Sequence, residues 1–260
     1  MYAKHAFVSV GFLALVLTVP VDTAAEMATA ETPQTAKSSD QLAWEARVPR
    51  SLREREAFAF VEEDPALPRV LLIGDSISIG YTPTVRHELA GIANVLRIPT
   101  NGGSTVRGLE SLDEWLGGKS WDVIHFNWGL HDLKYLNEDM ELDLSGVQQT
   151  PLESYEENLE KLVERLKQTK AKLLWASTTP VPEGASGRKK GDEVLYNAVA
   201  ARVMREHDIA IDDLYTCVLP NLEMYQRPRN VHFAEEGSAF LGKKVATEIR
   251  KALEQQEPVE

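Results

Sequence analysis

Cysteine and basic residues are both scarce in this sequence of 260 residues. Cys217 is the only cysteine, so no disulfide can form within the chain, and the folded part depends on its buried core. Lysine and arginine number 28 against 40 aspartates and glutamates, which gives a formal net charge of -12. Nucleic-acid binding needs clustered Lys and Arg, so this composition argues against a nucleic-acid partner.

Long hydrophobic runs are also missing, apart from a short one near the start. It extends from Ala6 to Val19, behind Lys4, and is followed by Pro20 and small residues. About fourteen residues fall short of the roughly 20 that a membrane-spanning helix needs, and the pattern is typical of a secretory signal peptide. We therefore predict a signal peptide over 1–25, a periplasmic or extracellular location, and no stable membrane insertion after cleavage. An uncleaved membrane anchor is the alternative.

Residues 26–40 are mostly Ala, Thr, Glu, Ser and Gln, with almost nothing to bury, and we predict a disordered linker there. The remaining residues, 41–260, suffice for one domain of ordinary size.

After Pro68, short apolar runs alternate with amphipathic segments, which is typical of parallel strands joined by helices. The expected strands are Val70–Ile73, Val95–Ile98, Val123–Asn127, Leu173–Ser177 and Ile209–Ile211. The expected helices are Thr82–Ala90, Thr105–Leu116, Leu152–Thr169, Glu193–His207 and Glu236–Gln255. This order predicts a three-layer α/β/α sandwich with a mostly parallel five-stranded sheet, of the flavodoxin-like kind.

In such folds a ligand binds beyond the carboxyl ends of the strands, so the residues after each apolar run are the candidates for a site. Ser76 follows the first run, behind Gly74 and Asp75. A serine at this point can be a nucleophile, or it can cap the helix that follows. We interpret Asp75 as a cap of this turn, with support of catalysis as the alternative.

Four short blocks together resemble those of the SGNH/GDSL hydrolases, and the resemblance covers roughly Arg69 to Leu253. The blocks are "GDS" at 74–76, "NGGST" at 101–105, "GLHD" at 129–132 and "NVHFAEEG" at 230–237. The resemblance implies a secreted esterase that transfers an acyl group to water through a covalent serine ester, without a cofactor.

The resemblance also implies a role for individual residues. Ser76 matches the nucleophile and His232 the general base. The backbone amides of Ser76 and Gly103 match two donors of the oxyanion hole. A third donor in the family is an asparagine, and His131 stands in its place. A histidine with a protonated ring nitrogen can donate a hydrogen bond as an amide does, so His131 can replace the asparagine. The alternative is that the His131 side chain points away from the site.

A second departure concerns the acid that orients the catalytic histidine, because Arg229 occupies its position. A guanidinium only donates hydrogen bonds, so it cannot take the proton of Nδ1 of His232. A backbone carbonyl, the side chain of Asn230, or an acid from elsewhere, such as Asp132 or Glu235, could accept it. The sequence leaves these alternatives open.

No cluster of histidines and carboxylates has the spacing of metal ligands, so we expect no metal site. The predicted loops of the site are polar and carry Arg107, Lys134 and Arg188. They favour a small-molecule or glycan ester with a short acyl group, such as an O-acetyl group on a carbohydrate, and Trp128 could stack on a sugar or lie in the core. Two alternatives remain: a catalytically silent carbohydrate-binding protein of the same fold, and a lipase or lysophospholipase.

Overall fold

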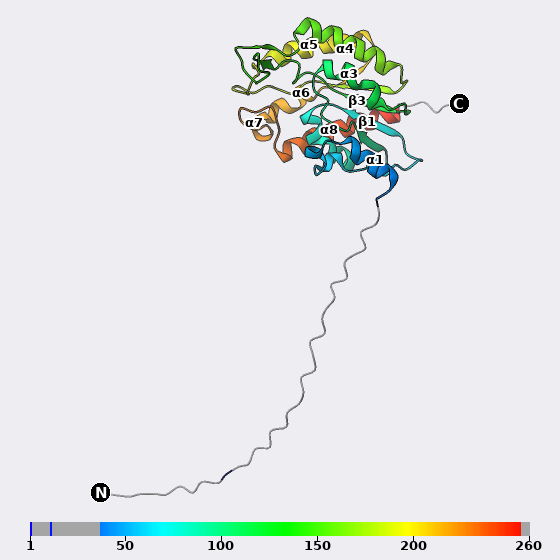
Figure 1. Cartoon of the computed structure of the whole chain (residues 1–260), viewed down its shortest axis with the longest axis vertical. Helices are drawn as coiled ribbons and strands as arrows, with labels where there is room; N and C mark the ends of the chain where they lie inside the picture. The colour runs from blue at the N-terminus through cyan, green and yellow to red at the C-terminus, as the bar shows by residue number, and fades with distance from the viewer. Residues whose placement is uncertain (2–10, 12–36, 256–260) are drawn as a thin grey trace. The chain divides into compact units, whose positions relative to one another are not determined.

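The computed structural model describes residues 37–255, together with Met1 and Gly11 (Figure 1). Apart from Met1 and Gly11, the predicted signal peptide lies outside these residues, as does most of the predicted linker. Helix α1 (Ser39–Arg47) begins within the range assigned to the linker. Its start is fixed by Ser38, whose side chain accepts a hydrogen bond from the backbone N–H of Gln41.

A parallel five-stranded sheet forms the centre of the domain, in the order β2-β1-β3-β6-β7. Its strands are β1 (Arg69–Ile73), β2 (Asn94–Arg97), β3 (Val123–Phe126), β6 (Lys172–Ala176) and β7 (Ala210–Asp212). The apolar residues of β1 and β3 are all buried, as expected of strands covered on both faces. The predicted three-layer fold is therefore confirmed.

Helices cover both faces of this sheet (Figure 1). On one face α2 (Ser76–Glu88) packs along α8 (Glu235–Glu254). On the other face lie α3 (Thr105–Leu116), α4 (Leu152–Lys167) and α5 (Asp192–Glu206). The shorter elements are α6 (Leu214–Val218), α7 (Leu222–Tyr225), η1 (Arg50–Leu52), η2 (Glu56–Phe58) and η3 (Leu219–Asn221).

Helix α2 starts six residues before the position Thr82 that the sequence predicts. The segment between contains Gly80 and two serines, which are weak helix formers. Asp75 offsets this weakness, because its carboxylate accepts a hydrogen bond from the N–H of Ile77 at 2.9 Å and so caps the first turn. Ile77, Ile79 and Tyr81 are then buried. The earlier start makes Ser76 the first residue of the helix.

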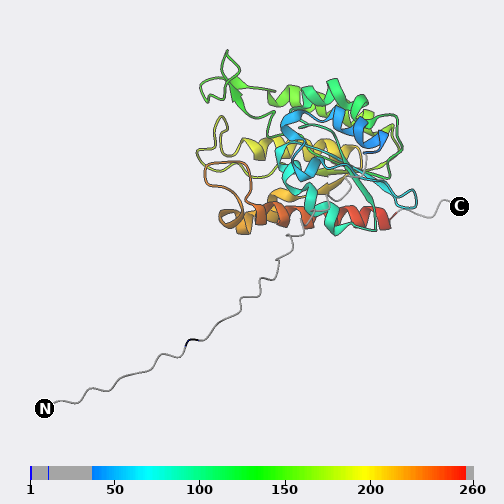
Figure 2. The ribbon, with the colours of Figure 1, turned by 60° about the horizontal axis from the view of Figure 1, so that its bottom comes forward.

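The loop after β3 carries a small antiparallel hairpin, β4 (Tyr135–Leu136) and β5 (Val147–Gln148). Figure 2 shows it in green, projecting at the end of the domain where the yellow and orange loops also lie. In the described residues no helix is both long and apolar enough to cross a membrane.

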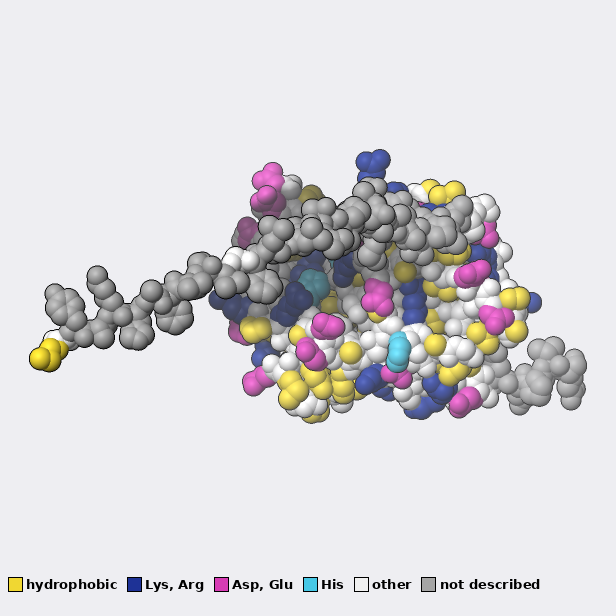
Figure 3. Space-filling model, turned by 90° about the horizontal axis from the view of Figure 1, so that it is seen from below, with side chains coloured by type: hydrophobic (Ala, Val, Ile, Leu, Met, Phe, Trp, Pro, Cys, Tyr) yellow, Lys and Arg dark blue, Asp and Glu magenta, His cyan; other side chains and the backbone are white. Residues whose placement is uncertain are grey.

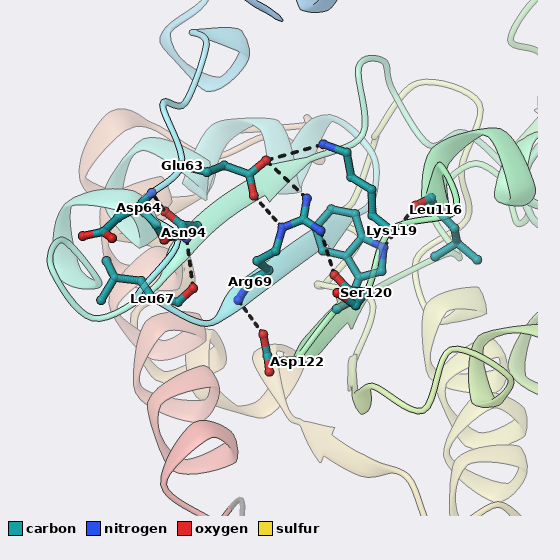
Figure 4. A network of polar contacts seen from close by, with 10 residues as sticks. Glu63, Asp64, Leu67, Arg69, Asn94, Leu116, Lys119, Ser120 and Asp122 are labelled. Carbon is teal, nitrogen blue, oxygen red and sulfur yellow. Dashed lines mark hydrogen bonds and ion pairs between the residues drawn. The ribbon is translucent and has the colours of Figure 1, made fainter.

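The amino end of β1 is held by a polar network (Figure 4). The guanidinium of Arg69 is paired with Glu63, donates to the carbonyl of Ser120 at 2.8 Å and lies 4.5 Å from the centre of the Trp121 ring. The side chain of Asn94 bonds the backbone of the segment before β1. These contacts close one end of the sheet, so the opposite, carboxyl end is where loops can form a site.

Candidate active site

Ser76 lies at the carboxyl end of β1, three residues after the end of that strand. As the first residue of α2, its backbone N–H has no acceptor within the helix and lies at the end where the helix dipole favours negative charge. Gly74 makes the turn possible, because a Cβ there would come within 2.9 Å of Ser78. Ser76 itself is half-buried, so its hydroxyl can contact a ligand.

His232 is bonded to Ser76 on one side and to Asn230 on the other. Its Nε2 lies 2.8 Å from Oγ of Ser76, and its Nδ1 lies 2.7 Å from Oδ1 of Asn230. The same Oδ1 also accepts the backbone N–H of His232 at 3.0 Å, which identifies it as the oxygen of the amide. An amide oxygen can only accept, so Nδ1 carries the hydrogen and Nε2 is free to accept the serine proton.

The loop that carries His232 is fixed by its own backbone and by Gln226. The N–H of Arg227 donates to the carbonyl of His232 at 2.9 Å, and the buried Gln226 side chain donates to the carbonyl of Pro180 at 2.6 Å. Arg229 occupies the turn, with a φ of 56°, and its side chain lies against Gly184. The residue in the family's acid position therefore shapes the loop.

The acids considered for His232 have other partners or positions. Oδ1 of the fully buried Asp132 accepts the N–H of Thr105 at 2.8 Å and its hydroxyl at 2.6 Å, so Asp132 holds the start of α3. Burial raises the pKa of Asp132 to about 7. Asp75 caps α2, and Glu235 is an exposed residue at the start of α8. Asn230 is the partner that the structure places on Nδ1.

The glycine loop of the second block packs directly on the serine turn. The N–H of Gly102 donates to the carbonyl of Gly74 at 2.9 Å, and a Cβ at Gly102 would approach that oxygen to 2.9 Å. Gly103, with a φ of 62°, donates its N–H to Oδ1 of Asn101 at 2.9 Å. The resemblance implies a free donor at Gly103, whereas this amide has an acceptor within the chain.

His131 follows β3 and has no hydrogen-bond partner for its side chain among the described residues, so a ring N–H is available. Burial lowers the pKa of His131 to about 4. The positive charges of Lys134, Arg188 and Arg107 also lower this pKa, whereas the negative charge of Asp75 raises it. Burial also lowers the pKa of His232. Both rings are therefore neutral at neutral pH.

A cavity of about 730 Å³ opens beside Ser76 and His232. Its wall is formed largely by residues of α2 and α8 and carries six charged side chains, those of Arg55, Glu56, Glu88, Arg227, Glu235 and Lys243. Trp128 does not reach it, since this ring is completely buried against Phe126 and Gly108. The idea of Trp128 as a sugar platform is thus wrong, and the residue belongs to the core. Among the described residues, no group of His, Cys, Asp and Glu could hold a metal ion.

Two supporting residues escape the sequence analysis. Asn101 precedes two glycines, a pattern typical of a turn closed by the asparagine side chain, and could have been identified from that. Gln226 gives no comparable signal, because its partners come from the distant Pro180 and from Val231.

Comparison with protein families places these residues in a known context. The model of the GDSL-like Lipase/Acylhydrolase family matches residues 72–240, which include Ser76, His131 and His232. The chain belongs to this family. This GDSL-like protein is therefore an ester hydrolase, and the prediction of the family from the four blocks is confirmed.

Solved structures of similar fold include several esterases. The acetyl xylan esterase AlAXEase has 16% sequence identity and a TM-score of 0.58, covering 70% of this GDSL-like chain and 99% of the other. A lipase/acylhydrolase from Enterococcus faecalis has 20% identity and a TM-score of 0.57, covering 73% and 99%. The acetylxylan esterase Axe2 from Geobacillus stearothermophilus has 18% identity and a TM-score of 0.57, covering 70% and 94%. At these identities the likeness shows the fold. No curated protein matches the sequence.

Proposed function

We propose that this chain is a serine esterase that removes short acyl groups, such as O-acetyl groups, from carbohydrates, with Ser76 as nucleophile and His232 as general base. The observation that carries the proposal is the arrangement of His232 between Oγ of Ser76, at 2.8 Å, and Oδ1 of Asn230, at 2.7 Å. It has the form of a catalytic triad in which an amide takes the place of the acid.

In the first half of the reaction, Oγ of Ser76 attacks the ester carbonyl while Nε2 of His232 takes the hydroxyl proton. The tetrahedral intermediate then collapses, the bond to the alcohol oxygen breaks, and His232 returns the proton to the leaving alcohol. In the second half, His232 takes a proton from water, the hydroxide attacks the acyl-serine, and the carboxylic acid leaves as Oγ regains its proton. Asn230 keeps Nδ1 protonated throughout.

The negative charge of the intermediate needs donors near Ser76. Its backbone N–H at the start of α2 is one, and the unengaged ring N–H of His131 is proposed as a second. Gly103 contributes only when its amide is shared with, or released by, Asn101. Asp75 and Asp132 support these groups indirectly, since the first caps α2 and the second ties the His131 loop to α3.

A short acyl group on a polar alcohol fits the surroundings better than a long acyl chain. Fatty-acyl sites are lined by apolar side chains, whereas this cavity carries charged groups along its wall. Two of the neighbours in fold are described as acetylxylan esterases. A signal peptide over 1–25 would direct such an enzyme to the periplasm or the exterior, where glycans are found.

The test is an assay with chromogenic acetyl (C2) and octanoyl (C8) esters on wild type, Ser76→Ala and Ser120→Ala. The control serine lies at the closed end of the sheet. We expect turnover to be lost in Ser76→Ala only, and the C2 ester to be preferred. Turnover in Ser76→Ala would rule out the serine mechanism. A preference for C8 would favour the lipase alternative, and the lack of any turnover by wild type would favour the silent binding protein.

A further inference from the structure

Five basic side chains surround the site without an acidic partner. They are those of Arg55, Arg107, Lys134, Arg188 and Arg227. In the part of the chain that the structure describes, none of them has a carboxylate oxygen within 4.0 Å, whereas Arg69 and Arg202 are both paired. The chain has a net charge of -12, so acids are plentiful elsewhere. The cavity wall also carries Glu56, Glu88 and Glu235, so what sets these five basic groups apart is that no carboxylate of the described residues lies close enough to pair with them.

The position of these groups links them to the reacting residues. Arg55 and Arg227 line the cavity together with Ser76 and His232. Besides burial, the charges of Arg188, Arg227 and Arg55 lower the pKa of His232, so all three lie within electrostatic reach of the base. Figure 3 shows Lys and Arg side chains beside a recessed histidine on the face that it draws.

Arg188 does not line the cavity, but its guanidinium is held by two backbone carbonyls. Its Nε donates to the carbonyl of Leu130 at 2.9 Å, next to His131, and its Nη1 donates to the carbonyl of Ser186 at 3.3 Å. These bonds fix a half-buried guanidinium whose Nη2 has no partner among the described residues. A guanidinium held in this way can bind a carboxylate through its remaining hydrogens. Asp75 is the acid whose charge acts on Arg188, and it is engaged in capping α2.

We infer that the ester substrate carries a carboxylate near the scissile bond and that Arg188, aided by Arg55 and Arg227, binds it. The substrate class is then an acylated acidic sugar. This inference rests on the proposed function, which it makes more specific. Arg188 is bonded to the carbonyl of Leu130, next to His131, and its charge acts on His232, so a carboxylate bound there would hold the neighbouring ester toward Ser76.

The test compares an O-acetylated methyl hexuronoside with its methyl ester, two substrates that differ in one charge. In wild type we expect kcat/KM to be at least tenfold higher for the acid, mainly through a lower KM. The preference should shrink in about 1 M salt, where the screening length falls to roughly 3 Å. Arg188→Gln should bring the ratio of kcat/KM for the acid to kcat/KM for the methyl ester close to one, and Arg188→Lys should keep part of the preference for the acid. Arg202→Gln, which removes a charge paired with Glu156, should keep the ratio.

Loss of the Leu130 bond could disturb the loop in Arg188→Gln, so Arg55→Gln and Arg227→Gln provide a second measurement. Their side chains have no hydrogen-bond partner among the described residues, and each should lower the ratio at least twofold. Equal kcat/KM for the two substrates in wild type would overturn the inference, as would an equal loss on both in Arg188→Gln. In either case loss of turnover in Ser76→Ala would show that the proposed function still stands.

Discussion

Replacing Asn230 by Asp would place a carboxylate at the atom that now accepts the Nδ1 hydrogen of His232. The present distance is 2.7 Å, and Asp has the same shape, so both hydrogen bonds to His232 should persist. Two opposite charges about 4 Å apart attract by about 1 kcal/mol in water and about 4 kcal/mol near a protein surface. At about 1.4 kcal/mol per pKa unit, and with His232 exposed on one side, the pKa of His232 should rise by about 1–2 units.

The assay is the pH dependence of kcat/KM on an acetyl ester between about pH 4 and pH 9. The base acts only when it is neutral, so a higher pKa moves the acidic limb of the profile to higher pH. In Asn230→Asp we expect the limb to move up by about 1–2 units, with a plateau at least as high as in wild type. An acidic limb that does not move would refute the contact between residue 230 and the base.

Asn230→Ala is the matched control, because it removes the acceptor without adding charge. A hydrogen bond to a charged group contributes about 1.5–3 kcal/mol, so the plateau should fall about 10- to 150-fold, and the acidic limb should not move to higher pH. A wild-type plateau in this variant would show that His232 is held in another way.

Three further predictions concern stability and the oxyanion. Asp75→Ala should lower the free energy of unfolding by about 0.5–2 kcal/mol because α2 loses its cap, whereas Ser76→Ala should not; equal melting temperatures of these variants would contradict the assignment of the cap. His131→Ala should reduce kcat by about 10²–10³-fold if its ring donates to the oxyanion, and His131→Asn should recover part of this; an unchanged kcat would exclude the role. Asp132 has a folded-state pKa raised by burial from 3.8 to about 7, so the folded protein holds this proton more tightly, and the wild type loses stability as pH rises from about 4 to 7. Asp132→Asn keeps an acceptor for Thr105 and does not titrate, so thermal melts should show its free energy of unfolding rising relative to that of wild type by up to about 3 kcal/mol between pH 5 and pH 8. A constant difference would mean that Asp132 titrates normally.

Much of the fold could be predicted because its signals are local. Each buried strand is a short apolar run, and α3 occupies the predicted range Thr105–Leu116. The predicted start of α2 at Thr82 was wrong because the actual start depends on the side chain of Asp75, which lies outside the helix, and on the tertiary burial of Ile77. The hairpin β4–β5 lies in a loop whose acidic sequence shows no alternation of apolar residues, so nothing local indicates it.

The site was predictable as a set of positions, whereas its bonding was not. The four blocks identify Ser76 and His232, but the partner of Nδ1 depends on how the loop turns at Arg229, and Asn230 was one alternative among several. Whether Gly103 is a free donor depends on the rotamer of Asn101. The role of Asp132 became visible only when Thr105 was found beside it. Such contacts join residues distant in sequence or depend on backbone angles, which apolar periodicity does not encode.

The packing of α2 against α8 has a consequence for the rate of the reaction. Ser76 is the first residue of one helix and His232 lies three residues before the other, so the spacing of the two helices sets the distance between Oγ and Nε2. That spacing depends on Gly242, where an added Cβ would come within 2.6 Å of Thr84. A methyl group placed at this buried contact would push the helices apart and lengthen a 2.8 Å hydrogen bond at their ends. The reactivity of the serine thus depends on the spacing of α2 and α8 at Gly242 as well as on the residues that react, and a search for faster or slower variants should include this position.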